Sequence, residues 1–327
     1  MLELQRATVV AADGARLEVE VDGERAAAWA DVGLVGPCEV GDEVVVNVQA
    51  RRLALGSGGF DVVHCNLTRG VGPAAAPAAG GAEPHVMKLN YTSLQHAVHP
   101  VEQAEALDLP LRTPVAVLAL HGHLEPLAWA FARAAPGARL GYVQAAGGAL
   151  PGALSETVRA LRADGVLAGH VTAGPAYGGA DGEAITTAGA LYDGRRWDAI
   201  VAGPGPGILG SGSALGHGGL AALDTAHAAL ALGAPTLLVA RMSEADPRER
   251  HRGLSHHTRT VLELLLRPVT VALPAGHDAA DARHDWRTED VDLAAYPGST
   301  RSMGREDPLF IAAALAAGTA LAGMIHR

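Results

Sequence analysis

The amino-acid sequence predicts an α/β protein, with a largely parallel, doubly wound sheet preceded by a small N-terminal β-barrel-like domain. Of its 327 residues, 49% are hydrophobic and 18% are charged, so the chain can bury a large core. Residues 1–69 contain short alternating runs between turn signals. After residue 114, apolar runs alternate with helical stretches, which is typical of a parallel sheet with helices on both faces.

The N-terminal segment has the pattern of consecutive β-hairpins. Polar and apolar residues alternate in residues 15–21 and 43–48. The pairs Asp13-Gly14 and Asp22-Gly23 separate such runs, and Asp-Gly is a strong signal for a tight hairpin turn. Four or five strands within residues 1–69 predict a small barrel of the size of an OB or SH3 domain.

Residues 70–84 are rich in Pro, Gly and Ala without periodicity, and we interpret them as a linker to an α/β domain at residues 85–327. The expected strands of that domain are apolar throughout, as strands covered on both faces should be. They are residues 115–120, 140–144, 170–172, 199–202, 236–240 and 269–273. The expected helices lie near residues 124–135, 153–163, 183–192, 220–232, 257–266 and 308–325.

The connections between these elements differ in length according to their direction. Those from helix to strand are short, as at residues 233–235. Those from strand to helix are long and rich in Gly, His and Arg, as at residues 203–219 and 241–256. In a parallel α/β sheet, strand-to-helix loops lie at the carboxyl edge, where ligands bind. The sequence therefore predicts a site at this edge, against the alternative that loops in any fold are polar.

Composition excludes several classes of protein. The formal net charge of −10 argues against a nucleic-acid partner, because phosphate neutralisation needs an excess of Lys and Arg. Cys38 and Cys65 are the only cysteines, which excludes a disulfide scaffold and a Cys-rich zinc site. The apolar run at residues 309–325 is rich in Ala and Gly, and we expect a buried or interface helix there in preference to a membrane anchor. We expect a cytoplasmic protein with no membrane partner, and a homodimer as its assembly.

The glycine-rich segment at residues 202–220, AGPGPGILGSGSALGHGGL, predicts an anion-binding loop, since glycine lets successive backbone N–H groups turn toward a ligand. It has no GxxxxGK[ST] pattern, and its GxGxxG match is not followed at once by a helix, so no nucleotide-cofactor motif is present. The alternative is a loop that only packs tightly. The expected ligand contacts here are Gly203, Gly205, Gly207, Gly210, Ser211, Gly212, Ser213 and His217.

The basic segment at residues 241–258, RMSEADPRERHRGLSHHT, predicts a short helix that begins after an Asp246 N-cap and ends at Gly253. On that helix Arg248, His251 and Arg252 would share one face, and guanidinium groups bind phosphate or carboxylate. The alternative is a solvated helix with local ion pairs. Further expected ligand contacts are Arg241, Ser243, Lys88, the single lysine of the chain, and His121.

A second helix is expected after a Ser255 N-cap, with His256 and His257 in its first turn. The positive end of the helix dipole should lower the pKa of these histidines and favour neutral imidazole, which binds metals and transfers protons. We therefore take Asp246, His251, His256 and His257 as the candidate catalytic residues. Asp246, His251 and His257 are also candidate ligands of a divalent metal, with His121 or His123 as a further ligand, although their spacing matches no strong zinc motif.

The acidic segment at residues 277–292 leaves two interpretations open, a surface loop and a metal-binding flap. It contains His277, His284 and several carboxylates, and Trp286 would anchor it to the body of the domain.

Three segments together resemble an uncharacterised bacterial family that is classed only as a domain of unknown function. They are ADPRERHRGLSHHT at residues 245–258, GPGILGSG at residues 205–212 and MKLNYT at residues 87–92. The resemblance extends over most of the chain and implies that the segments form one site, but the family has no established reaction to transfer. This chain departs from the family at Glu244, where a bulky apolar residue is usual, and at Ser211 or Ser213, where Thr is usual.

Three hypotheses follow from these residues. The first is an enzyme, a hydrolase or group transferase, that acts on a small anionic metabolite, with the glycine-rich loop and the arginines holding the anion. The second is a non-catalytic ligand sensor that uses the same cleft. The third is a structural protein in which the glycine-rich loop and the C-terminal helix form an oligomer interface.

Overall fold

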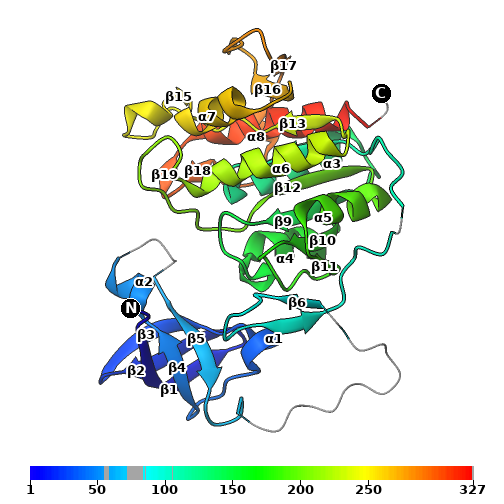
Figure 1. Ribbon diagram of the computed structural model, residues 1–327. Coiled ribbons are helices and arrows are strands. Elements are labelled where there is room, and N and C mark those ends of the chain that lie inside the picture. Colours follow the sequence, from blue (N-terminus) through cyan, green and yellow to red (C-terminus); the bar gives the residue numbers. More distant parts are fainter. Residues whose placement is uncertain (55–58, 72–83, 85, 105, 326–327) are drawn as a thin grey trace. The chain divides into compact units, whose positions relative to one another are not determined.

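A computed structural model of the chain describes residues 1–54, 59–71, 84, 86–104 and 106–325 (Figure 1). The chain divides into two compact units, Met1–Val98 and His99–Arg327. The first unit contains a closed five-stranded barrel and the second an eight-stranded sheet whose neighbouring strands are all parallel. The α/β class with an N-terminal barrel, expected from the sequence, is therefore confirmed.

The barrel has the strand order β1-β2-β3-β5-β4 and closes through the pairing of β4 with β1. Its strand pairs are antiparallel except β3 with β5, which run parallel. A short helix, α1 (Val32–Val35), connects β3 to β4, and α2 (Gln49–Arg52) follows β4. The strands are β1 (Leu4–Asp13), β2 (Arg16–Val21), β3 (Glu24–Trp29), β4 (Glu43–Asn47) and β5 (Asp61–Asn66).

The two Asp-Gly pairs form the expected hairpin turns of the barrel. Gly14 has φ 59°, Asp22 has φ 54° and Gly23 has φ 80°, so the turns need residues that tolerate the left-handed region. Alternate residues of each strand face the interior, where Val19, Val44 and other apolar side chains are fully buried. The first unit also includes the hairpin of β6 (Val86–Lys88) and β7 (His96–Val98). Most of the expected linker, residues 72–83, lies outside the described residues.

The parallel sheet of the second unit has the order β11-β10-β9-β12-β8-β13-β16-β17. Both of its faces are covered, so alternate residues of one strand enter different cores. Val115 and Val117 of β8 face one core, and Ala116 between them faces the other. The strands are β8 (Val115–Val117), β9 (Leu140–Ala145), β10 (Leu167–Ala173), β11 (Gly182–Ala184), β12 (Ala199–Pro204), β13 (Thr236–Leu238), β16 (Thr270–Pro274) and β17 (Asp285–Glu289).

The helices divide between the two faces of this sheet (Figure 1). Helices α3 and α4 contribute to one apolar core, and α5, α6 and α7 contribute to the other. Helix α8 packs mainly in the core of α3 and α4, while its residues Leu309 and Ala313 belong to the other core. Their bounds are α3 (Leu124–Ala134), α4 (Glu156–Ala163), α5 (Thr187–Asp193), α6 (Ala221–Ala231), α7 (His256–Leu264) and α8 (Pro308–Ala322).

The C-terminal apolar run forms α8, which packs along α3. Thirteen of its fifteen residues are buried, so its small side chains serve close packing inside the fold. Gly318 lies where a Cβ atom would come within 2.3 Å of the carbonyl oxygen of Leu127 in α3. Among the helices of the described residues, none is long and apolar enough to cross a membrane.

Two strands at the sheet edges were not expected from the sequence. β11 occupies Gly182–Ala184, at the start of the helix expected near residues 183–192, and that helix begins only at Thr187. β17 lies within the acidic segment at residues 277–292, pairs with β16 and has no buried residue along its length. Both are edge strands, which lack the continuous apolar pattern of central strands because one side of each stays open.

We expect Gly318→Ala to destabilise the protein by about 1–3 kcal/mol, because the added methyl group would separate α3 from α8. Gly323→Ala is the matched control, since a Cβ atom there would have only ordinary contacts at 3.4 Å or more. Urea unfolding of both variants measures the difference. Equal stability of the two variants would contradict the close approach of α3 and α8.

Candidate functional site

The candidate site lies at the carboxyl edge of the sheet, where the direction of winding changes. β12, β8 and β13 are neighbours, but the helix that follows β8, α3, lies on the opposite face from α6 and α7, which follow β12 and β13. Loops after adjacent strands then diverge, and such a switch point leaves a crevice outside the strand ends. The glycine-rich and basic segments are the loops after β12 and β13, so the structure places both at the switch point.

The basic loop after β13 is pinned at its base by the backbone. β14 (Met242–Ser243) pairs with β15 (Gly253–Leu254), and the N–H of Ser255 donates to the carbonyl of Arg241 (2.9 Å). The prediction of a helix between Asp246 and Gly253 is wrong, since this segment forms a single 3₁₀ turn, at Glu249–His251. Nε of Arg252 donates to the Asp246 carbonyl (3.1 Å), which would have accepted the first hydrogen bond of that helix. Arg248, His251 and Arg252 therefore do not share a helix face.

Asp246 is the centre of a buried charge cluster. Its fully buried carboxylate accepts from Nε and Nη2 of Arg248 (2.9 and 2.8 Å), from Arg241 (3.4 Å) and from Arg305 (3.3 Å). The Arg248 hydrogen bond is the main reason why the pKa of Asp246 lies well below its usual range. Burial lowers the pKa of Arg241 to about 10, and Asp246 opposes that shift. With three arginines on its oxygens, Asp246 positions guanidinium groups, and the structure does not bring it among the histidines as a metal ligand.

A second carboxylate holds this loop from the start of α8. Asp307 accepts from the hydroxyl of Ser243 and from the N–H of Glu244 (3.2 Å). The same Ser243 hydroxyl accepts from the backbone N–H of Asp246 (3.0 Å), so it connects the Asp307 carboxylate to the backbone of Asp246. Ser243 is thus a positioning residue inside the fold.

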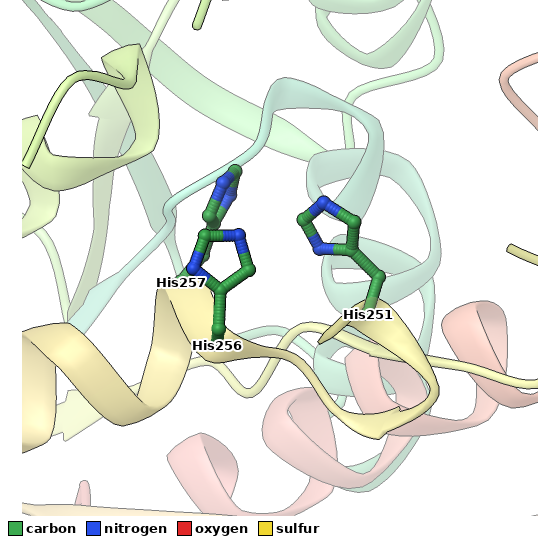
Figure 2. A group of neighbouring side chains, drawn as sticks. All are labelled: His251, His256 and His257. Carbon is green, nitrogen blue, oxygen red and sulfur yellow. The ribbon is translucent and has the colours of Figure 1, made fainter. Parts of the chain in front are cut away.

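Three imidazole rings meet beside this charge cluster. The ring centroids of His251 and His256 are 4.7 Å apart, those of His256 and His257 are 4.4 Å apart, and those of His251 and His257 are 4.8 Å apart. Figure 2 shows that the rings project to the same side of the segment that carries them. One nitrogen from each ring lies within 4.8 Å of the others, so this group could hold a metal ion. His251 and His257 are buried, whereas His256 is half-buried.

The glycine-rich loop adds a fourth histidine to the cluster. His217 stacks on His257 with ring centroids 3.6 Å apart and planes 7° apart. An isolated antiparallel β-bridge pairs Gly210 with His217, so the loop doubles back between these two residues. A Cβ atom at Gly219 would lie 3.3 Å from Nδ1 of His217 and 3.5 Å from Nδ1 of His257, so a glycine leaves room for this stack.

Ser255 connects the start of α7 to the histidines. Its hydroxyl oxygen accepts from the N–H of His257 (3.2 Å), as the N-cap expected from the sequence, and it also bonds Nδ1 of His251 (2.8 Å). Nε2 of His251 and Nε2 of His256 are buried without a hydrogen-bond partner. Both ring nitrogens of His217 and Nε of Arg241 are unpaired as well. Buried polar atoms are nearly always paired, so several such atoms in one cluster indicate a place for a ligand.

The rings are held in the neutral form. Burial is the main cause of the low pKa of His251 (about 4), of His256 and of His257, and the charge of Arg241 lowers all three further. The low pKa expected from the sequence is present, with burial as its largest cause and neighbouring guanidinium groups next. The cluster therefore combines uncharged imidazoles with fixed positive charge.

The other residues of the glycine-rich loop have local roles. Ser211 and Ser213 bond each other (3.0 Å) and the backbone of Gly216 within the exposed part of the loop. A Cβ atom at Gly203 would come within 2.6 Å of Leu118, and one at Gly205 within 2.3 Å of the carbonyl of Ala149, so packing alone accounts for these two glycines. Gly207 and Gly212 have positive φ angles. Anion binding by this loop stays a prediction.

His121 belongs to a separate buried network. Its Nε2 bonds the hydroxyl of Ser155 (2.8 Å), and its Nδ1 lies 3.2 Å from the carbonyl oxygen of Pro204, which also accepts from the hydroxyl of Tyr142 (2.9 Å). This network ties together the carboxyl ends of β8, β9 and β12. Lys88 is buried in β6, which belongs to the first unit, whereas the histidine and arginine cluster belongs to the second unit.

The structure adds residues to the site that the sequence pattern does not indicate. Arg305 and Asp307 precede α8 and lie far from the basic segment in sequence, so no local pattern links them to it. Arg250 lies beside the glycine-rich loop, where a Cβ atom at Gly212 would be 3.3 Å from its Nη2. His123, in the 3₁₀ turn His121–His123 after β8, is fully buried and stacks on Phe310 at 4.0 Å. His123 was a candidate metal ligand, but among the described residues the group that could hold a metal contains only His251, His256 and His257.

These features define a class of protein: a parallel α/β domain with a histidine and arginine cluster at its topological switch point, preceded by a small β-barrel. The profile of the family described as "Protein of unknown function (DUF3866)" matches residues 25–318. The match covers most of both units, and the chain belongs to this family. No curated protein matches the chain.

We expect Asp246→Asn to lower the free energy of unfolding by about 3–5 kcal/mol, because it leaves the buried Arg241 without its carboxylate partner. Glu18→Gln is the control, since Glu18 has a partly exposed ion pair with Arg25 at 3.6 Å, and we expect a loss of less than about 1 kcal/mol. Denaturant unfolding measures both. A loss below 1 kcal/mol for Asp246→Asn would show that this charge cluster does not stabilise the fold.

The stability of the protein should fall as the pH drops below about 6.5, the ordinary value for histidine. Burial and the charge of Arg241 lower the pKa of His123 to about 3, and neither of its ring nitrogens is hydrogen-bonded. As the pH falls, His123 is therefore protonated in the unfolded chain at a higher pH than in the folded protein. Its contribution to stability is present above pH 6.5 and is lost progressively toward pH 3. The free energy of unfolding of the wild type should fall between pH 7 and pH 5. In His123→Phe, which keeps the stack on Phe310, we expect this fall to be smaller by up to about 2 kcal/mol. Urea titrations at both pH values test this, and equal losses would refute it.

Proposed function

We propose that this protein is an enzyme, a hydrolase or group transferase, that acts on a small anionic metabolite at the carboxyl edge of its parallel sheet. The observation that carries the proposal is the direct contact between Arg241 and His257, inside a cluster that holds two further neutral imidazoles. Fixed positive charge attracts an anionic substrate, and a neutral imidazole transfers protons to and from it.

The charges around the cluster favour an anion. Arg241, Arg248 and Arg250 all act on the ring of His256, and no carboxylate is among the main influences on its pKa. Asp246 is already shared among three arginines, so it offsets only part of their charge. Arg248 and Arg250 are exposed, which makes them available to a ligand that arrives from solvent.

In hydrolysis the imidazole would take a proton from water as the water oxygen bonds to the phosphorus or carbonyl carbon of the substrate. The proton would then pass to the leaving oxygen, so the ring ends the reaction neutral. His251 is the best candidate for this base, because Ser255 holds its ring through Nδ1 and its Nε2 has no partner in the fold. Ser243, Ser255 and Asp307 support the site without contact to the substrate.

The test is a screen of the purified full-length chain against phosphate esters and carboxylate esters of small metabolites. For an ester that is turned over, we expect His251→Gln to lose about 10²–10⁴-fold in kcat, the usual contribution of acid–base catalysis. His64→Gln in the barrel is the matched control and should keep full activity. Unchanged kcat in His251→Gln would refute the assignment, and anion binding without turnover of any ester would favour the ligand-sensor hypothesis.

A further inference from the structure

The contact between Arg241 and His257 fixes the position of one proton. Nη1 of Arg241 lies 2.9 Å from Nδ1 of His257, and both side chains are buried. A guanidinium group has donors and no acceptor, so Nδ1 of His257 must accept. The neutral ring then carries its proton on Nε2 and offers a donor at that atom.

The other two rings each have a nitrogen in need of a partner. Nε2 of His251 and Nε2 of His256 are buried and unpaired, and His251 is 1% exposed. Nδ1 of His251 is already bonded to Ser255, so Nε2 is the atom left for a ligand. All three rings project to one side, and the half-buried His256 marks the side of the cluster nearest to solvent (Figure 2).

Two kinds of ligand could bind between these rings, a metal cation and an oxyanion. A cation bound by three imidazoles needs a lone pair from each ring, but Arg241 already donates to the Nδ1 lone pair of His257. The cation would also lie among the charges of Arg241, Arg248 and Arg250. An oxyanion meets the opposite conditions, since it accepts from ring N–H groups and is attracted by the guanidinium groups.

We propose that His251, His256 and His257, with Arg241 and Arg250 beside them, form an oxyanion site that holds a phosphate group of the substrate. A tetrahedral phosphate has enough oxygens to meet three rings, and its protonated oxygens can donate to a ring nitrogen that keeps a lone pair. The inference rests on the proposed function, because it assigns the anionic group of the substrate to this cluster.

Isothermal titration of the full-length chain with inorganic phosphate tests the proposal. We expect saturable binding of one phosphate per chain, weakened about tenfold or more in His256→Gln, since a hydrogen bond to a charged group contributes on that scale. His256 is the residue of choice because its Nε2 has no partner in the fold, so its replacement breaks no contact at that atom. His64→Gln is the control and should bind phosphate like the wild type.

A second measurement reads the ring protons directly. In protein labelled with ¹⁵N at histidine, long-range ¹H–¹⁵N spectra should show the Nε2–H tautomer of His257, assigned by its loss in His257→Gln. Added phosphate should shift the signals of His251 and His256. Equal phosphate affinity in His256→Gln and the control would overturn the proposal, and so would stoichiometric zinc that is lost in His256→Gln.

Failure of this inference and failure of the proposed function give different results. If an ester is turned over but phosphate does not bind at the rings, the phosphate site is wrong and the enzyme assignment stands. If phosphate binds at the rings but no ester is turned over, the site stands and the enzyme assignment fails.

Discussion

The buried guanidinium group of Arg241 is the constraint on which the rest of the site depends. It lies between a carboxylate, Asp246, and an imidazole, His257. A buried cation is costly unless it is paired, so Arg241 depends on the ionised carboxylate of Asp246. Arg248 and Arg305 donate to the same carboxylate.

The same charge explains why the histidines are neutral and why they suit an anion. Burial and the charge of Arg241 both lower the pKa of His251, His256 and His257. A ring that resists a proton for this reason also resists a metal cation, whereas an incoming anion relieves the repulsion. The chemistry that the sequence left open between metal and anion is therefore decided, in our proposal, by the neighbours of the rings.

The fold was largely predictable because it depends on patterns that are local in sequence. Asp-Gly turns predicted the barrel hairpins, and continuous apolar runs predicted the central strands. The errors fell where tertiary contacts outweigh local preference. The helix after Asp246 was predicted from sound capping residues, and the Asp246 carboxylate does accept from the N–H of Arg248. The Arg252 side chain, however, occupies the Asp246 carbonyl that the first helical hydrogen bond would use. The edge strand β17 had no apolar pattern to reveal it.

The sequence by itself determined that the basic and glycine-rich segments lie at one edge of the sheet, because both follow strands and a parallel sheet places all such loops at its carboxyl edge. It also determined the start of α7, since Ser255 caps that helix through its own neighbours. Only the tertiary structure decided which atoms meet there. Asp307 and Arg305 reach the site from the chain before α8, and His217 reaches it from the loop after β12. Contacts between segments so far apart in sequence depend on how the helices pack on the sheet, and no local pattern encodes them.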